Sequence, residues 1–205
     1  YKKYNCYCIG VTWWGVESMP SKKPLRRPED FKGIKIRAPH GMTAELFRRL
    51  GASVIILPGG EVYSALERGV IDATDWGTPS MNYRLGFWEV TKYFNYPGFH
   101  SMPVGDFTAN MDSWKALPDD VKAVLETAVR EWAWDSIERV AIDDIKAVKM
   151  MKEKGITPIR WSDEDLMRLR KVAMEIWDDW AKKSPMCKKA VEAQKAWLRM
   201  LGLLK

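Results

Sequence analysis

Short apolar runs alternate with segments of helical periodicity over the first half of the chain. Apolar residues that alternate with polar ones, or that form a short run, predict strands, whereas apolar residues three and four apart predict helices. A polar segment with three prolines, over 17–30, is expected to be a loop. The predicted elements are strands over 4–14, 34–38, 54–57 and 70–73 and helices over 43–50 and 61–68. This order is typical of an α/β protein built from βαβ units, whose ligand sites lie beyond the carboxyl ends of the strands.

The second half of the chain is predicted to be helical. Neither Gly nor Pro occurs over 119–154, and apolar residues recur there at helical spacing. Because Pro118 suits a first helical turn and Gly155 a helix end, we expect one helix of about 36 residues, roughly 54 Å long. Two helices that meet at a bend without a sequence signal are the alternative. A capping box at the start of 162–181 predicts another helix, and the last helix is expected over 185–201.

The composition is that of a globular chain. Its 205 residues are 46% apolar, which is enough to bury a sizeable core, and no uninterrupted apolar run reaches the length of about 18 residues that a membrane span needs. The net charge of +6 comes from basic residues scattered among 27 carboxylates, so nucleic acid is not an expected partner. A modest positive field would instead favour the approach of small anions.

The cysteines and histidines predict neither a disulfide framework nor a zinc site. Three cysteines cannot all pair within the chain, and Cys6 and Cys8 would share one face of a strand without the geometry of an easy disulfide. His40 and His100 are the only histidines, and their spacing fits no zinc motif. The first residues lack the pattern of a signal peptide. We therefore expect either a mature chain or a fragment.

Four sequence blocks resemble one receptor family. Residues 31–39 (FKGIKIRAP) resemble the pattern "LKGLKIRVP" of the DctP-type solute receptors of TRAP transporters. Residues 60–73 (GEVYSALERGVIDA) resemble "GEVYxALxxGxIDA", and residues 96–100 (YPGFH) resemble "YPGWH". Asn110 and residues 114–118 match "NkxxWxxLP". Since these blocks occur in order over about residues 15–160, the chain is identified as similar to this family.

The resemblance implies a two-lobed periplasmic-binding-protein-like α/β fold with a long bracing helix. Family members carry more sequence before the point where this chain begins, so we expect the first lobe to be incomplete here. The implied segments are a hinge-crossing strand over 1–14, the ligand-binding second lobe over 15–102, part of the first lobe and the start of the long helix over 103–140, and the rest of that helix with the C-terminal helices over 141–205. The resemblance also implies a periplasmic location and membrane subunits of a TRAP transporter as partners. We further expect a homodimer through the C-terminal helices.

Arg37 is the main candidate for ligand binding. It lies at the carboxyl end of a predicted strand, where side chains face a ligand crevice. A guanidinium can make two parallel hydrogen bonds to a carboxylate, which a lysine cannot. In the family the matching arginine clamps the substrate carboxylate, whereas outside it a solvated strand end or an ion pair would be the ordinary interpretation. We therefore expect the ligand to be a small carboxylate.

Asp75 and Trp76 follow the next predicted strand end. In the family branch that binds 2-keto or 2-hydroxy acids, the matching acidic residue and tryptophan lie in the cleft. There the tryptophan carbonyl and carboxylates hold a sodium or calcium ion that bridges to the substrate, and oxygen ligands suit such hard cations. Asp75 and Trp76 are thus candidate metal ligands. The alternative is a turn residue followed by a core aromatic.

Phe99 and His100 are candidate ligand contacts, because they follow a Pro-Gly turn that could present them to the cleft. The branch usually continues "WHEPG", with the glutamate as a metal ligand, but Ser101 stands in its place here. That departure leaves the ion with fewer charged ligands, so we expect ligand binding to tolerate metal chelation. A structural histidine is the alternative for His100.

Two other functions remain open from the sequence. An enzyme acting on small organic acids would need a positioned acid or base, and no nucleophile elbow, Walker loop or metalloprotease helix is found. Asp75 and His100 could form an acid–base pair, but their spacing is not diagnostic. A receptor for a two-component sensor or for another transporter class is the second alternative.

Overall fold

The computed structural model describes residues 1–204, which form two compact units of mixed α/β structure. Unit 1 consists of residues 1–20 and 76–158, and unit 2 of residues 21–75 and 159–204. The lobe boundaries implied by the family resemblance stay a prediction beside this division. None of the helices in residues 1–204 has both the length and the apolar character needed to cross a membrane.

Unit 2 is built on a small sheet whose central strands are parallel. Strands β4 (Ser53–Ile55), β3 (Lys35–Arg37) and β5 (Ala73–Thr74) lie side by side in that order, and Ser21 of β2 (Pro20–Ser21) pairs antiparallel with β5. Ile36 is fully buried and pairs with Val54 and Ala73, while Lys35 before it is exposed, as strand alternation predicts. The connections carry α1 (Met42–Arg49), α2 (Val62–Glu67) and the 3-10 turns η2 (Pro28–Phe31) and η3 (Gly59–Glu61).

One strand begins later than the sequence predicts. The expected strand over 70–73 is observed as β5 (Ala73–Thr74). The N–H groups of Val70 and Ile71 both donate to the Ala65 carbonyl, at 2.9 and 3.2 Å, so they close the end of α2 and do not join the sheet. Gly69, with φ of +73°, permits that turn. A short apolar run after a helix therefore served partly as a helix cap.

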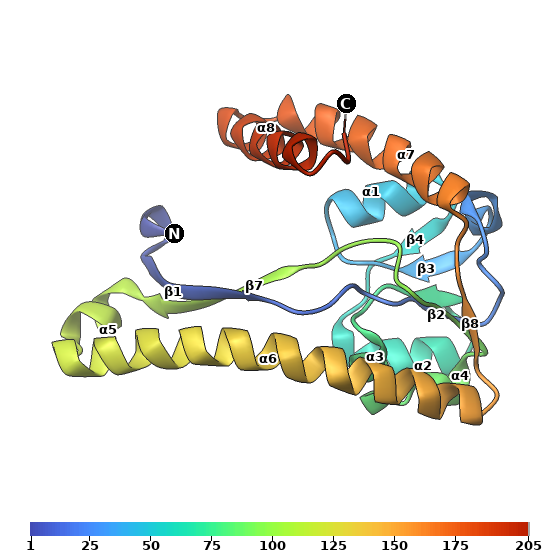
Figure 1. Ribbon diagram of the computed structural model, residues 1–205, viewed down its shortest axis with the longest axis horizontal. Helices are drawn as coiled ribbons and strands as arrows, with labels where there is room; N and C mark the ends of the chain where they lie inside the picture. The colour runs from blue at the N-terminus through green and yellow to red at the C-terminus, as the bar shows by residue number, and fades with distance from the viewer. Residues whose placement is uncertain (205) are drawn as a thin grey trace. The chain divides into compact units, whose positions relative to one another are not determined.

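The C-terminal helices belong to unit 2. The Oγ of Ser162 accepts a hydrogen bond from the Asp165 N–H at 3.1 Å, which confirms the predicted cap of α7 (Asp163–Ala181). Helix α8 (Pro185–Met200) follows and packs on α7, as Figure 1 shows. Both helices agree with the predicted ranges to within one residue.

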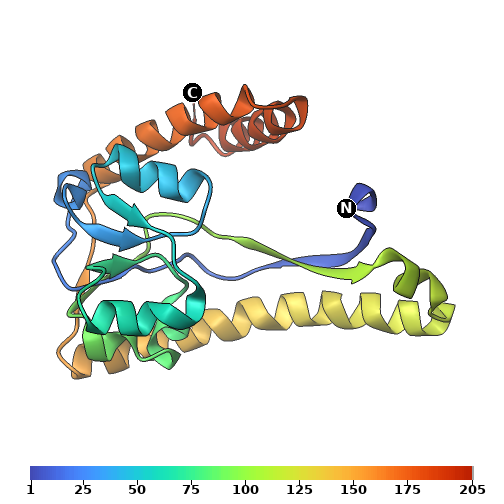
Figure 2. The same cartoon turned by 180° about the vertical axis from the view of Figure 1, so that it is seen from behind.

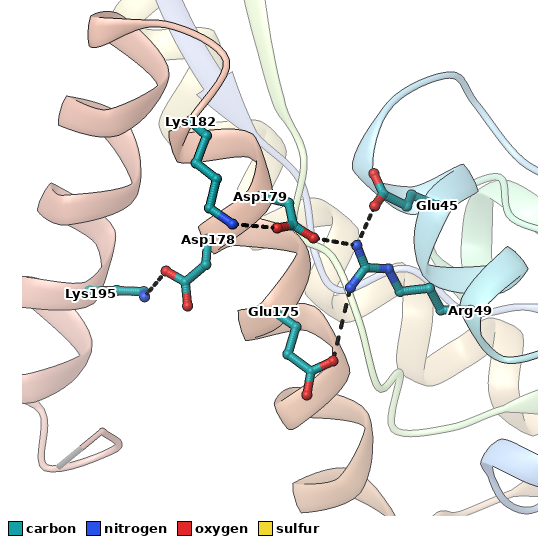
Figure 3. A network of polar contacts seen from close by, with 7 residues as sticks. All are labelled: Glu45, Arg49, Glu175, Asp178, Asp179, Lys182 and Lys195. Carbon is teal, nitrogen blue, oxygen red and sulfur yellow. Dashed lines mark hydrogen bonds and ion pairs between the residues drawn. The ribbon is translucent and has the colours of Figure 1, made fainter.

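A network of charged side chains joins α7 to α1 (Figure 3). Arg49 on α1 donates to Glu45 at 2.6 Å and to Asp179 on α7 at 2.7 Å, and Lys182 donates to Asp179 at 2.9 Å. The hydrogen bonds from Arg49 and then from Lys182 lower the pKa of Asp179 to about 2. The hydrogen bond from the Trp180 indole, followed by that from Arg49, lowers the pKa of Glu45. These side chains are partly exposed to solvent, so the network orients the two helices more than it stabilises the protein.

Unit 1 contains a long two-stranded ribbon and a long helix. Strands β1 (Cys6–Trp13) and β7 (Val104–Asn110) pair antiparallel, with a bulge between Cys8 and Gly10. Helix α6 (Asp119–Glu153) is continuous over 35 residues and packs on β1, so the single long helix is confirmed (Figures 1 and 2). The remaining elements are η1 (Lys2–Tyr4), α3 (Pro79–Arg84), α4 (Phe87–Val90), β6 (Tyr93–Asn95) and α5 (Met111–Ala116), and β8 (Thr157–Ile159) begins in unit 1 and ends with the first residue of the second part of unit 2.

Helix α3 is fixed to the long helix by a side chain that caps it. The Ser80 N–H, in the first turn of α3, donates to Oδ1 of Asp144 on α6 at 2.8 Å. Such a carboxylate satisfies a backbone donor that the helix itself leaves without an acceptor, and it interacts favourably with the helix dipole. The start of α3, three residues after Trp76, is thereby held against α6.

Candidate functional site

Arg37 and Asp75 meet at the carboxyl ends of two adjacent parallel strands of unit 2. Arg37 ends β3 and pairs in register with Thr74, the last residue of β5. The Asp75 N–H donates to the Arg37 carbonyl at 2.8 Å, and Nη1 of Arg37 donates to the Asp75 carbonyl at 2.6 Å. Arg37 is half-buried, and Asp75 is only 2% exposed. The structure thus brings two of the predicted site residues together at the edge where α/β proteins bind ligands.

The contact between these residues fixes the direction of the Arg37 guanidinium. This group carries five N–H donors in one plane, so a single strong bond to a main-chain carbonyl sets the orientation of the whole fork. The carbonyl that accepts it belongs to the strand end itself, which is rigid because Thr74 and Asp75 are buried. A guanidinium held in this way has the geometry that suits planar recognition of a carboxylate.

Trp76 begins the part of unit 1 that follows Asp75. Its indole ring is half-buried and meets the buried ring of Phe87 edge-on, with ring centroids 6.0 Å apart. Phe87 starts α4 and is only 2% exposed, so it is a packing residue. Packing on one edge holds the Trp76 ring in place while part of the residue remains accessible.

Phe99 and His100 lie together in the segment that follows β6. Their rings are 5.0 Å apart, and both residues are half-buried in unit 1. The preceding turn contains a cis peptide bond between Tyr96 and Pro97 and a close backbone approach at Gly98. A Cβ atom added at Gly98 would lie 2.0 Å from the Glu17 carbonyl oxygen, so no residue larger than glycine fits without displacing the main chain. This turn therefore places Phe99 and His100 directly beside the segment that carries Glu17.

Glu17 is a further candidate site residue, which the sequence analysis did not identify. The Ser101 hydroxyl donates a short hydrogen bond to the Glu17 carboxylate, and the Glu17 N–H donates to the Ser101 carbonyl at 3.0 Å. A carboxylate oxygen of Glu17 and a ring nitrogen of His100 lie within 4.8 Å of each other. A carboxylate thus stands next to Ser101, at the position where the family pattern would place a glutamate. No local signal distinguishes Glu17 from other acidic residues in a polar loop, because the contact joins segments far apart in sequence.

The oxygen donors of unit 1 suit a hard cation better than the sequence alone indicates. Glu17 supplies a carboxylate near Ser101, and Trp76 offers a main-chain carbonyl, whereas the His100 nitrogen is a poor ligand for sodium or calcium. This donor chemistry fits the ion that the family resemblance implies. The assignment of Asp75 and Trp76 as metal ligands stays a prediction, with Glu17 added to it.

The chain matches the bacterial extracellular solute-binding protein family 7 over residues 1–184. It is 30% identical over 181 residues to a monocarboxylate 2-oxoacid-binding periplasmic protein of Nostoc sp., covering 88% of this chain and 50% of that protein. It is 32% identical over 152 residues to the C4-dicarboxylate-binding periplasmic protein DctP of Rhodobacter capsulatus, covering 72% of this chain and 45% of that protein. The chain therefore spans about half the length of the curated relatives it matches.

Solved structures of TRAP periplasmic solute-binding proteins have the same fold. A TRAP periplasmic solute-binding protein from Rhodobacter sphaeroides, in an apo open form, has a TM-score of 0.77 and 34% identity, over 99% of this chain and 65% of that one. A TRAP periplasmic solute-binding protein from Rhodoferax ferrireducens with bound malonate has a TM-score of 0.87 and 24% identity, over 98% of this chain and 64% of that one. These similarities confirm the predicted fold class. They also support the prediction of a binding protein over that of an enzyme, since the family and the matched proteins are solute-binding proteins.

Proposed function

The chain belongs to family 7 of the bacterial extracellular solute-binding proteins, and from this premise we propose that it captures a small organic acid anion and delivers it to the membrane subunits of a TRAP transporter. The observation that carries the proposal is Arg37, whose guanidinium is held by the Asp75 carbonyl at the carboxyl end of the unit 2 sheet. A fixed, half-buried guanidinium at a strand end is suited to bind one carboxylate through two parallel hydrogen bonds.

The proposed ligand class is a 2-oxo or 2-hydroxy monocarboxylate. Arg37 would bind its carboxylate, while Trp76, Phe99 and His100 would contact the rest of the molecule. A half-buried indole and the paired rings of Phe99 and His100 offer apolar surface with few donors, which suits a short carbon chain with one polar substituent. The relative from Nostoc, named for binding monocarboxylate 2-oxoacids, supports this class.

The proposed role of Glu17 and Trp76 is to hold a sodium or calcium ion beside the ligand. An ion there would attract the 2-oxo or 2-hydroxyl oxygen, so acids with such an oxygen would bind better than plain carboxylates. The Ser101 hydroxyl donates to the Glu17 carboxylate and would fix its direction.

The proposed location is the periplasm, as for the relatives, and the proposed oligomer is a homodimer through α7 and α8. Apolar side chains on α8 support the dimer, because Met186, Trp197 and Met200 are 74%, 53% and 78% exposed. Apolar surface of this kind is typical of interfaces. A sensor receptor or a receptor of another transporter class would have a similar binding site, and adjacent genes for TRAP membrane subunits would decide between them.

A thermal-shift screen against small carboxylates tests the proposed function. A ligand at a hundred times its dissociation constant stabilises the folded protein by about 2.7 kcal/mol, which gives a clear rise in melting temperature. We expect pyruvate and other 2-oxo monocarboxylates to stabilise most, lactate next, and propionate or dicarboxylates least. A turnover assay on 2-oxo acids should then show that the ligand is released unchanged. Conversion of the acid into a product would favour the enzyme alternative, and no stabilisation by any acid would contradict the proposal.

A further inference from the structure

Asn82 connects two segments of unit 1 that are far apart in the sequence. It lies in α3 and is only 3% exposed. Its side-chain nitrogen donates to the Ser18 carbonyl at 2.7 Å and to the Gly77 carbonyl at 2.8 Å. A carboxamide nitrogen carries two hydrogens, so both of its donors are used, one on each segment. The side chain therefore acts as a cross-link between residues 17–18 and residues 76–77.

The two segments also meet directly, in one isolated antiparallel bridge. The Ser18 N–H donates to the Gly77 carbonyl at 2.9 Å, and the next antiparallel pair along the chain, Ser21 with Ala73, is separate from this bridge. A single bridge opens easily, because one hydrogen bond contributes only about 0.5–1.5 kcal/mol. The two bonds from Asn82 therefore reinforce the contact between the segments at this bridge.

Other contacts fix the residues around this cross-link. Ser18 is 1% exposed, and its hydroxyl donates to the Asn95 carbonyl at 2.8 Å. A Cβ atom at Gly77 would lie 3.0 Å from the Met81 sulfur, so the second segment lies tightly against α3. Helix α3 is in turn capped by Asp144 of the long helix α6. Asn82 therefore reaches both segments from a fixed position.

We propose that Asn82 is a positioning residue, which fixes the main chain at Ser18 and Gly77 and so sets the places of Glu17 and Trp76 next to them. This assignment rests on the proposed function, in which Glu17 and Trp76 contact the ligand or its ion. Asn82 itself touches neither, because its side chain is buried against main-chain carbonyls. Loss of its amide would let the two segments separate. The oxygen atoms of Glu17 and Trp76 that would hold the ion beside the 2-oxo group would then move, while Arg37 and Asp75 in unit 2 stay in place.

Hydrogen exchange of the ligand-free protein tests the cross-link independently of any ligand. In Asn82→Ala, the Ser18 amide should exchange about tenfold faster than in the wild type, because two bonds that support its bridge are gone. Thr91→Val is the matched control, since Thr91 is also buried in unit 1 and donates to one main-chain carbonyl, that of Phe87 at 2.7 Å. The control should lose stability without faster exchange at Ser18. Asn82→Ser, which keeps one donor, replaces the alanine variant if that variant does not fold.

Binding of pyruvate and propionate separates positioning from a merely structural role. In the wild type, pyruvate should bind better than propionate. In Asn82→Ala, the pyruvate affinity should fall about tenfold while the propionate affinity changes less than threefold, so the preference is lost. An equal loss for both acids, or the same loss of preference in Thr91→Val, would overturn the assignment.

The two measurements distinguish the failure of this proposal from the failure of the proposed function. If the wild type binds neither acid, the proposed ligand class is wrong, and the exchange of Ser18 still decides whether Asn82 holds the segments together. If Ser18 exchange in Asn82→Ala equals that of the wild type or of Thr91→Val, the cross-link is refuted whatever the protein binds.

Discussion

Arg37 and Asp75 are joined by two hydrogen bonds that run in opposite directions. The Asp75 N–H donates to the Arg37 carbonyl at 2.8 Å as part of the sheet, and the Arg37 guanidinium returns a bond of 2.6 Å to the Asp75 carbonyl. The first bond exists for any residue at position 37, whereas the second needs a side chain that is long and rich in donors. Arginine at this position therefore does more than end a strand.

Arg37→Ala should weaken binding of the cognate acid strongly. Removing one partner of a buried, hydrogen-bonded charge pair costs about 2–5 kcal/mol, which is roughly thirty- to several-thousand-fold in affinity. Arg37→Lys should recover little, because lysine keeps the charge but not the planar fork. Calorimetry measures both, with Arg68→Ala as a control at an exposed arginine of the same unit. A loss below threefold in both variants would place the carboxylate contact elsewhere.

Removal of the metal ion should weaken ligand binding, because the proposed site holds that ion through the Glu17 carboxylate. The sequence alone predicted tolerance of chelation, because Ser101 replaces a glutamate, but the Glu17 carboxylate accepts a hydrogen bond from Ser101 and restores a negative group there. In sodium-free buffer with a chelator, affinity should fall about tenfold or more, since a contact to a charged group contributes about 1.5–3 kcal/mol. Calcium or sodium should restore it.

Glu17→Gln is the control for this effect. The variant should bind weakly, and its affinity should be the same with chelator and with added calcium, as calorimetry in the two buffers would show. If the wild-type affinity does not change on chelation, the sequence-based expectation that binding tolerates metal removal is supported. The proposed site then holds no ion.

Gly98→Ala should destabilise the protein and impair binding together. The new methyl group would lie 2.0 Å from the Glu17 carbonyl oxygen, which is main chain and can move only with its segment. Overpacking of this kind costs about 1–3 kcal/mol in the free energy of unfolding. Gly60→Ala is the matched control, because no heavy atom lies within 4 Å of the added Cβ there. Urea unfolding of both variants measures the difference, and equal stability of the two would contradict the close approach at Gly98.

Asp179 should make stability depend on pH at the acid end. Its pKa is lowered from 3.8 to about 2 by hydrogen bonds from Arg49 and Lys182, so the folded state binds this proton less readily than the unfolded state. The stabilisation is therefore present above about pH 4 and is lost as the pH falls towards 2. Wild type should melt at a higher temperature than Asp179→Asn at neutral pH.

The difference in melting temperature between these two proteins should shrink over that acid interval. Glu153→Gln serves as a control, because Glu153 is exposed and its ion pair with Lys149 is loose at 4.0 Å. Its melting temperature should follow that of the wild type at every pH. A difference in melting temperature between wild type and Asp179→Asn that stays constant from neutral pH down to pH 2 would show that the network does not lower the pKa of Asp179.

The sequence alone determined the elements whose signals are local. The long helix α6 followed from apolar spacing without Gly or Pro, and the start of α7 followed from Ser162, because a cap is decided by residues three apart. The place of Arg37 at a strand end followed from alternation around Ile36. The strand at 70–73 was predicted less well, since the same apolar run also closes α2. A local sequence pattern predicts an element correctly where only that element uses the residues. It predicts less well where two elements share the same residues.

The tertiary structure alone decided which distant residues meet. Glu17 lies beside Ser101, and Asn82 holds Ser18 and Gly77, although nothing in their own segments marks them for these roles. Gly98 is required because another main-chain segment passes at that point, not because its own turn needs it. Such contacts depend on how whole elements pack, and packing is a property of the folded chain. The proposed site residues that a motif carries could therefore be named from the sequence, and those proposed to complete or position the site could not.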